Sequence, residues 1–246
     1  MSWTQDTTAE KLRKRHFTLE RDGRRIPGVA WSRAGETGPR PLVLVGHGGS
    51  QNKESTGVTD IAIPLATQRG WVVAAIDGPV HGDRRTDGER EGGPVITDFR
   101  ALWNERPSID EMVADWRTAI DFLTQQPDVD AQAVGWFGIS MGTAYGLPLC
   151  ASEPRMRAAM LGMWGTSHAH GAEMVAHARR VRCPVLFQRQ RDDARFTPAG
   201  QEELFAAIGS ADKELRVYEG THANPAGVQL DDGLQFLVWH LEGARR

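Results

Sequence analysis

Residues 138–142 read Gly-Ile-Ser-Met-Gly and are the most informative five positions in this chain of 246 residues. An apolar run, Ala-Val-Gly-Trp-Phe, precedes them at residues 133–137, and small residues that suit a helix follow at residues 143–147. Strand, sharp turn and helix are the context in which Gly-x-Ser-x-Gly forms a nucleophile elbow. The pattern therefore predicts that Ser140 sits in a strained turn of positive φ, at a helix N-terminus that favours developing negative charge.

Composition and charge indicate a water-soluble globular protein. Charged residues make up 25% of the chain and hydrophobic residues 40%, the usual balance for one large α/β domain. The net charge of -3 gives no reason to expect a nucleic-acid partner, and no apolar run is long enough to span a membrane. Residues 1–16 lack the apolar segment of a secretory signal, and Cys150 and Cys183 make neither a metal motif nor a disulfide framework. We therefore expect a small-molecule substrate and a cytoplasmic location, with homodimer formation left open.

Apolar strands alternate with helices along most of the chain, which predicts one mostly parallel twisted sheet with helices on both faces. Residues 16–20 and 26–31 are alternating runs joined by Asp22-Gly23, so we expect antiparallel N-terminal strands. Residues 1–15 are expected to be a polar leader with at most a short helix. Further strands are expected at residues 42–45, 71–76, 133–137, 156–163, 184–188 and 214–218, and helices at residues 60–70 and 109–123, within 164–180, and at 198–208 and 231–241.

One long polar segment, residues 83–108, separates a buried strand from the next helix. It is rich in arginine, acidic residues and glycine, with a few isolated large apolar side chains. A connection of this length is usually functional or mobile, so residues 83–108 are expected to be a cap or lid. Apart from this insertion, residues 1–246 are expected to form a single domain. Ser108 is expected to cap the following helix through a capping box with Glu111. The candidate substrate-binding residues are Phe99, Trp103, Trp164 and His81.

Acid and base partners for Ser140 follow two later strands. A serine hydroxyl is a poor nucleophile until a base takes its proton and an acid orients that base. Parallel sheets collect functional residues at the carboxyl ends of their strands. One expected strand is followed by Asp192 and Asp193, and the next by His222. The order serine, aspartate, histidine predicts a triad of Ser140, one of the two aspartates as acid, and His222 as base.

These motifs resemble those of the α/β-hydrolase family, and within it the dienelactone-hydrolase-like and prolyl-oligopeptidase-like serine esterases. The resemblance covers residues 40–241 and implies an α/β-hydrolase fold with the second aspartate of the pair, Asp193, as the triad acid. Phe196 and Thr197 depart from the family pattern because they lengthen the distance from Asp193 to Pro198. The motifs are Gly-His-Gly-Gly (46–49), Asp-Gly-Pro-Val-His-Gly (77–82), Gly-Ile-Ser-Met-Gly (138–142), the segment 184–198 and Gly-Thr-His (220–222).

Two backbone N–H groups are expected to form an oxyanion hole. One belongs to Met141, which follows the nucleophile, and the other to the loop after residues 42–45, at Gly49 or alternatively at Ser50. The resemblance implies hydrolysis of a carboxylic ester or lactone through an acyl-enzyme on Ser140, without a cofactor. Dienelactone hydrolases proper use a cysteine nucleophile, and this chain has a serine instead.

Other kinds of function fit parts of the sequence. The same triad serves acyltransferases, thioesterases, peptidases and C–C hydrolases, and nothing in the sequence separates these from an esterase. A non-catalytic ligand-binding protein on the same fold is disfavoured because such proteins usually have a broken triad. His168, His170, Glu173 and His177 have partial metal-ligand spacing. A polar loop over the pocket explains them better, and we expect no metal.

Overall fold

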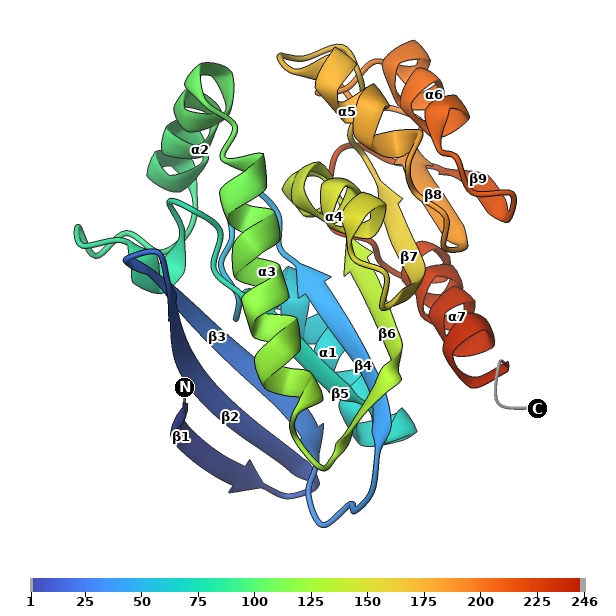
Figure 1. Cartoon of the computed structure of the whole chain (residues 1–246). Helices are drawn as coiled ribbons and strands as arrows, with labels where there is room; N and C mark the ends of the chain where they lie inside the picture. The colour runs from blue at the N-terminus through green and yellow to red at the C-terminus, as the bar shows by residue number, and fades with distance from the viewer. Residues whose placement is uncertain (1, 244–246) are drawn as a thin grey trace.

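The computed structural model describes residues 2–243, which contain one sheet of nine strands (Figure 1). The strands are β1 (Ser2–Ala9), β2 (Leu12–Arg21), β3 (Arg24–Arg33), β4 (Arg40–Gly46), β5 (Val72–Ile76), β6 (Val129–Gly138), β7 (Met156–Gly162), β8 (Val185–Gln190) and β9 (Lys213–Tyr218). Their order is β1-β2-β3-β5-β4-β6-β7-β8-β9. β1 to β3 are antiparallel, β3 pairs antiparallel with β5, and all later pairs are parallel. The predicted mostly parallel sheet with antiparallel N-terminal strands is confirmed.

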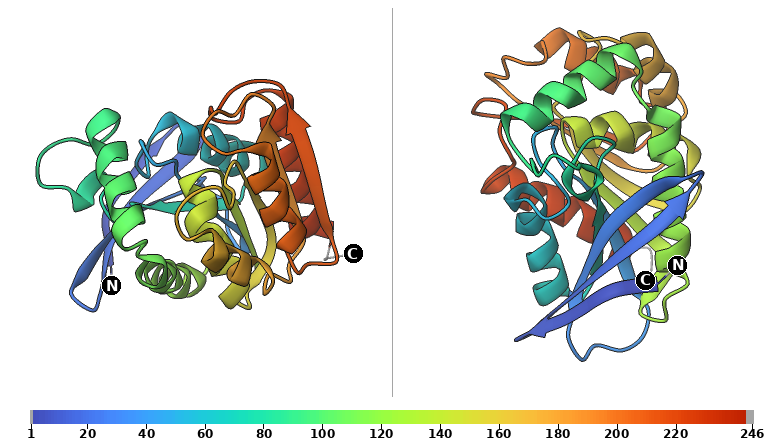
Figure 2. Two further views of the ribbon diagram at one scale, coloured as in Figure 1. Left: turned by 90° about the horizontal axis from the view of Figure 1, so that it is seen from above. Right: turned by 90° about the vertical axis from the view of Figure 1, so that its left-hand side faces the viewer.

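Helices cover both faces of the sheet. They are α1 (Thr56–Arg69), α2 (Gly93–Glu105), α3 (Ile109–Thr124), α4 (Met141–Ser152), α5 (Gly171–Ala178), α6 (Pro198–Ala207) and α7 (Val228–Glu242). The buried side chains of α1 and α7 join one core cluster, and those of α3 to α6 join the cluster on the other face. The antiparallel strands lie at one edge of the sheet and β9 at the other (Figure 2). The carboxyl ends of β4 to β9 therefore meet along one rim.

The N-terminal ribbon differs from the expected polar leader, because residues 2–9 form β1. This is an edge strand whose side chains are mostly exposed, so its sequence lacks the apolar alternation that marks a half-buried strand. Trp3 anchors it by packing on Phe17 and Phe122, with ring centroids 5.7 and 5.0 Å apart. A single aromatic anchor in a polar run leaves no periodic signal in the sequence.

The polar segment 83–108 contains a helix that its composition concealed. A short 3-10 helix, η1 (Gly82–Arg84), leads through a loop to α2, which lies beyond the carboxyl ends of the parallel strands and above α3 in Figure 1. The buried residues of α2 are Val95, Phe99 and Trp103, spaced by four residues along a single face. Half of the other positions of α2 are charged or polar, and Gly93 and Pro94 stand at its start, so the apolar stripe does not stand out in the sequence.

Ser108 directly precedes α3 but does not cap it through its side chain. Its backbone is left-handed, with φ 52, and its hydroxyl donates to the Arg106 carbonyl at 3.4 Å. Glu111 instead forms an ion pair with Arg106. The predicted capping box is wrong because a capping side chain needs an extended backbone to reach back to the helix N–H groups. Gly70, by contrast, closes α1 in the left-handed conformation, at the end of the predicted helix 60–70.

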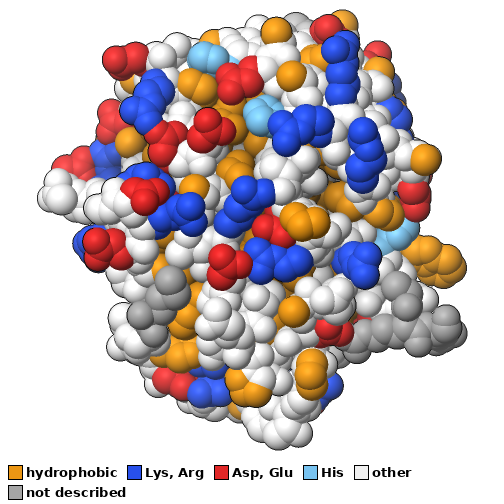
Figure 3. Space-filling model, viewed as in Figure 1, with side chains coloured by type: hydrophobic (Ala, Val, Ile, Leu, Met, Phe, Trp, Pro, Cys, Tyr) orange, Lys and Arg blue, Asp and Glu red, His pale blue; other side chains and the backbone are white. Residues whose placement is uncertain are grey.

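The face of the molecule in Figure 3 carries mixed charge. Lysine and arginine side chains are interspersed there with aspartate and glutamate rather than gathered by sign. Within residues 2–243, no helix is both long enough and apolar enough to cross a membrane.

Candidate active site

Ser140 occupies the turn between β6 and α4. Its φ of 55 and ψ of -122 lie outside the regions that a residue with a side chain adopts comfortably. Its N–H donates to the Gly162 carbonyl at 2.9 Å, which helps to hold the turn. The flanking glycines are required for space. A Cβ on Gly142 would lie 2.4 Å from the Gly46 oxygen, and one on Gly138 would lie 3.0 Å from the Gly142 Cα.

Three side chains from different strand ends form a hydrogen-bonded row at the rim. Ser140 Oγ lies 2.9 Å from Nε2 of His222, which follows β9. His222 Nδ1 lies 2.9 Å from Oδ2 of Asp193, which follows β8. A carboxylate can only accept, so Nδ1 carries the proton and Nε2 is free to accept from the serine hydroxyl. The structure thus brings together the three residues that the sequence selected.

The Asp193 carboxylate is buried and fully engaged. Its Oδ1 accepts the backbone N–H groups of Arg195 and Phe196 at 2.8 and 3.2 Å, and Gln201 Nε2 lies 3.4 Å from Oδ2. Burial alone would raise the pKa of Asp193, but the hydrogen bond from His222 and the two backbone donors outweigh burial and lower it. The carboxylate therefore stays ionised beside His222.

Asp192 does not take part in the hydrogen bonds between Ser140, His222 and Asp193. Its side chain is exposed, and its backbone N–H donates to the Gly220 carbonyl at 2.9 Å. Phe196 and Thr197, the two residues that depart from the family pattern, hold the segment around Asp193 in place. Phe196 donates its N–H to Asp193 and packs against Trp164, with ring centroids 4.6 Å apart. Thr197 caps α6 by accepting the Gly200 N–H at 3.1 Å.

The loop after β4 begins beside the nucleophile turn, since Gly46 pairs with Gly138 in the sheet. Among the described residues, no acceptor takes the N–H of Gly49, Ser50 or Met141. His47 Nδ1 donates to the Gly48 carbonyl at 2.9 Å, and in a trans peptide this fixes the direction of the Gly49 N–H. His81 Nε2 donates to the Gly49 carbonyl at 3.0 Å and fixes the Ser50 N–H in the same way.

Both histidines are neutral parts of this loop structure. Burial lowers the pKa of His47 to about 4 and that of His81 to about 3. His47 Nε2 accepts the Gly78 N–H at 2.9 Å, so its Nδ1 carries the proton. His81 is completely buried and does not line the cavity beside Ser140. The expectation that His81 contributes to a substrate pocket is therefore corrected: it lies behind the loop and supports it.

A cavity of about 450 Å³ opens beside Ser140. Phe99 and Trp103 of α2 form one wall, and Trp164 and Phe196 form another, so three of the four predicted substrate-binding residues line it. Phe196 is the aromatic residue that the sequence did not select, although its departure from the family pattern was visible. The remaining lining residues are Ile96, Arg100, Asn104, His168, Ala194 and Arg195.

Three of the four candidate metal residues have other contacts. His168 Nε2 donates to the Arg195 carbonyl at 2.7 Å, and its ring packs on Phe196. His170 Nδ1 lies 3.5 Å from Glu173 Oε2. Within residues 2–243, no three His, Cys, Asp or Glu side chains converge as metal ligands do.

A mostly parallel sheet covered by helices, with a serine on a strand–helix turn and an acid and a base after later strands, defines an α/β-hydrolase. The family model for dienelactone hydrolases matches residues 82–225. The chain is 34% identical to a cold-adapted esterase from an Arctic intertidal metagenomic library, over 98% of this chain and 100% of that one, with a TM-score of 0.86. The chain belongs to the dienelactone hydrolase family and is a hydrolase.

More distant solved structures share the fold. A putative dienelactone hydrolase from Klebsiella pneumoniae subsp. pneumoniae MGH 78578 is 19% identical over 95% of this chain and 99% of that one, with a TM-score of 0.76. An acetyl xylan esterase from Paenibacillus sp. R4 is 19% identical over 98% and 88% of the two chains, with a TM-score of 0.73. The predicted resemblance to this family and its fold is confirmed.

Proposed function

We propose that the protein is a serine esterase that cleaves a carboxylic ester or lactone of a small molecule through an acyl-enzyme on Ser140. The observation that carries the proposal is the row of two 2.9 Å hydrogen bonds from Ser140 to His222 to Asp193, placed at the wall of a cavity. The similarity to an esterase over 98% of this chain and 100% of the other supports the same reaction class.

The row supplies the proton transfers of a two-step acyl transfer. As Ser140 Oγ attacks the carbonyl carbon, His222 Nε2 takes its proton, and Asp193 holds the imidazole in the correct tautomer and stabilises the imidazolium. His222 then gives the proton to the departing alcohol oxygen. A water molecule repeats the attack on the acyl-enzyme, with His222 again as base, and releases the acid and the free serine. No step requires a cofactor.

The free N–H groups of Gly49 and Met141 are the proposed oxyanion hole. They come from the loop after β4 and from the start of α4, and both lack an acceptor within the described part of the chain. The α4 N-terminus adds its dipole to the same point. Losing one such donor lowers kcat by about 10²–10³. A side chain on Gly49 would meet Ile96 Cδ1 at 2.7 Å, so the loop approaches the cavity wall closely.

The cavity walls are the proposed substrate-binding surface, and the segment 83–108 is the proposed lid. Phe99 and Trp103 reach the cavity from α2, and Trp164 faces Trp103 edge-on at 4.9 Å. Aromatic walls around about 450 Å³ suit the apolar part of a small ester, since ligand pockets of this size are mostly apolar with few polar groups.

Active-site labelling tests the proposed nucleophile. A fluorophosphonate probe should label the wild-type protein at one site, Ser140, and Ser140→Ala should lose both the label and turnover of p-nitrophenyl acetate. Ser167→Ala is the matched control, because Ser167 is an exposed serine on the loop after β7 whose hydroxyl accepts the Thr197 N–H at 3.4 Å. Labelling that survives in Ser140→Ala would refute the assignment.

A further inference from the structure

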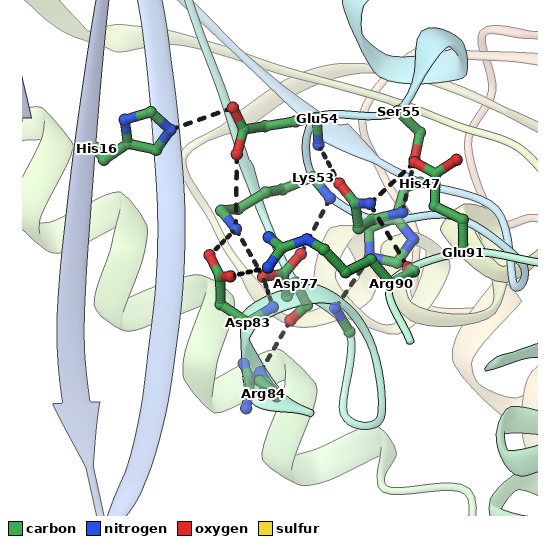
Figure 4. Close-up of polar contacts among 12 residues, drawn as sticks. His16, His47, Lys53, Glu54, Ser55, Asp77, Asp83, Arg84, Arg90 and Glu91 are labelled. Atoms are coloured by element: carbon green, nitrogen blue, oxygen red, sulfur yellow. Dashed lines mark hydrogen bonds and ion pairs between the residues drawn. The ribbon is translucent and has the colours of Figure 1, made fainter. Parts of the chain in front are cut away.

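Lys53 is a buried lysine that the proposed mechanism does not use. Its side chain is 1% exposed, and its Nζ lies 2.8 Å from Asp77 Oδ2 and 2.5 Å from Asp83 Oδ2. Asp77 is fully buried, and its Oδ1 accepts the Lys53 backbone N–H at 3.0 Å. Figure 4 shows Lys53 among these contacts, with Arg90 paired to Asp83. We call Lys53, Asp77, Asp83 and Arg90 the Lys53 cluster.

The Lys53 cluster joins two loops that leave different strands. Lys53 lies in the loop 47–55 between β4 and α1, whereas the two aspartates lie in the turn 77–84 after β5. The turn itself is wound around Asp77, whose Oδ2 accepts the Asp83 N–H at 2.8 Å and whose carbonyl accepts Arg84 Nε at 3.0 Å. Buried charges of this kind persist only when each is paired. The ammonium group therefore fixes the spacing of the two loops.

The turn 77–84 also holds the peptides that carry the N–H groups of Gly49 and Ser50, of which Gly49 belongs to the proposed oxyanion hole. The Gly78 N–H donates to His47, whose other ring nitrogen donates to the Gly48 carbonyl. His81 donates to the Gly49 carbonyl. A displacement of this turn relative to the loop 47–55 would thus rotate the peptides whose N–H groups form the proposed oxyanion hole.

The start of the lid is tied to the same loop. The Gly92 N–H donates to the Ser50 carbonyl at 2.8 Å. Glu91 Oε1 accepts Asn52 Nδ2 at 2.9 Å and also the Ser55 hydroxyl. Because α2 begins directly after these residues, the aromatic wall that it carries is held to the loop 47–55 as well.

We propose that Lys53 is a positioning residue, which sets the oxyanion-binding N–H groups against Ser140 by clamping the loop 47–55 to the turn 77–84. The proposal rests on the esterase function proposed above. A misplacement of about 1 Å at a reacting group lowers the rate about a hundredfold, so kcat is the sensitive quantity. KM is much less sensitive, because neither Lys53 nor Asp77 lines the cavity.

Two variants separate positioning from stability of the fold. Lys53→Met keeps the length of the side chain but leaves the buried Asp77 carboxylate without its cation. Lys53→Met/Asp77→Asn restores the charge balance, since Asp83 keeps Arg90 as its partner at 2.5 Å. Lys14→Met is the matched control, because Lys14 pairs with Glu54, the neighbour of Lys53, on the outer side of the same loop. Each variant is assayed with p-nitrophenyl acetate for kcat and KM, and by thermal unfolding.

We expect Lys53→Met to lower kcat about tenfold to a hundredfold with KM within about twofold. The double variant should recover the melting temperature but not kcat. The pH midpoint of kcat/KM should be the same in both Lys53 variants as in wild type. Lys14→Met should match wild type in all of these quantities. Recovery of kcat together with stability in the double variant would overturn the proposal, as would a loss confined to KM. Should Lys53→Met fail to fold, Asp83→Asn, whose side chain is 38% exposed, must still lower kcat. An unlabelled, inactive wild type would instead refute the esterase function.

Discussion

Replacement of Asp193 by asparagine puts the proposed acid to a test whose outcome can be worked from its hydrogen bonds. An amide has one oxygen, whereas the Asp193 carboxylate uses Oδ1 for two backbone N–H groups and Oδ2 for His222 Nδ1. The amide oxygen should stay with the two backbone donors, because each buried N–H left unpaired costs about 1–3 kcal/mol. The amide nitrogen then faces His222 Nδ1 and donates its N–H to it. The imidazole must therefore carry its proton on Nε2, the nitrogen beside Ser140.

In that tautomer His222 cannot accept the serine proton. Recovering the competent tautomer means rotating the amide and leaving both backbone N–H groups unpaired, at a cost of about 2–6 kcal/mol. Each 1.36 kcal/mol is a factor of about ten in rate, so this cost lowers kcat by about 30-fold to 10⁴-fold. Loss of the carboxylate charge beside the imidazolium adds to it. We therefore expect kcat to fall by about 10³–10⁴ in Asp193→Asn.

Asp192→Asn is the control for this experiment, since Asp192 is the exposed neighbour of the same chemical type. Its kcat should stay within about twofold of wild type, as for surface substitutions in general. Both variants are assayed with p-nitrophenyl acetate at saturating substrate, after circular dichroism has shown that they are folded. If Asp193→Asn keeps kcat within about tenfold, or if Asp192→Asn is the damaging change, the reasoning from the amide geometry fails.

Three further outcomes are expected. Ser140→Ala should melt at the same temperature as wild type or higher, because it removes only a hydroxyl whose single partner among residues 2–243 is His222 and leaves the backbone at φ 55 unchanged. A clear drop in melting temperature would contradict this. Trp103→Ala should raise kcat/KM for long acyl esters relative to short ones. It should also lower the free energy of unfolding by about 3–5 kcal/mol, since Trp103 is 3% exposed. An unchanged dependence of kcat/KM on acyl-chain length would show that Trp103 is not part of the acyl pocket. The pKa of Asp193 is lowered in the folded state, so its contribution to stability is complete above its unfolded pKa of about 3.9 and is lost as pH falls through the folded value. Urea unfolding between about pH 3 and 5 should therefore show a weaker acid dependence in Asp193→Asn than in wild type.

The predictable parts of the fold rest on two features: short apolar runs that mark buried strands, and the parallel arrangement that brings the ends of these strands together. Buried strands of four or more apolar residues, such as 42–45 and 133–137, are distinctive, and parallel strands bring their carboxyl ends to one rim. Ser140 and Asp193 each follow a buried strand, and His222 follows the partly buried edge strand β9, so their meeting at the rim could be expected without knowing any distance. β1 and α2 could not be predicted in the same way, because an edge strand and a narrow helical stripe bury too few side chains to leave a period.

The supports of the site were the least predictable part. Lys53 stands in a run of polar residues, which ordinarily indicates a solvated loop, and its partners Asp77 and Asp83 lie more than twenty residues away in a different loop. His81 gave a similar difficulty, because a histidine in a glycine-rich turn fits a pocket wall as well as a buried donor. Only the three-dimensional arrangement of the loops shows which of these polar groups are buried.

The way in which Asp193 is held leaves the side chain of Arg195 free. The Oδ1 atom of Asp193 is bound by main-chain donors, so the exposed Arg195 side chain makes none of these hydrogen bonds, although it lines the cavity. Phe196 is different, because its ring is 5% exposed and packs against Trp164 and His222. Substitution of Arg195 should therefore reshape the acyl or alcohol site while the hydrogen bonds of the carboxylate survive, with proline as the exception because it has no N–H. A library confined to residue 195 would explore substrate preference at a position that tolerates side-chain exchange next to the reacting serine.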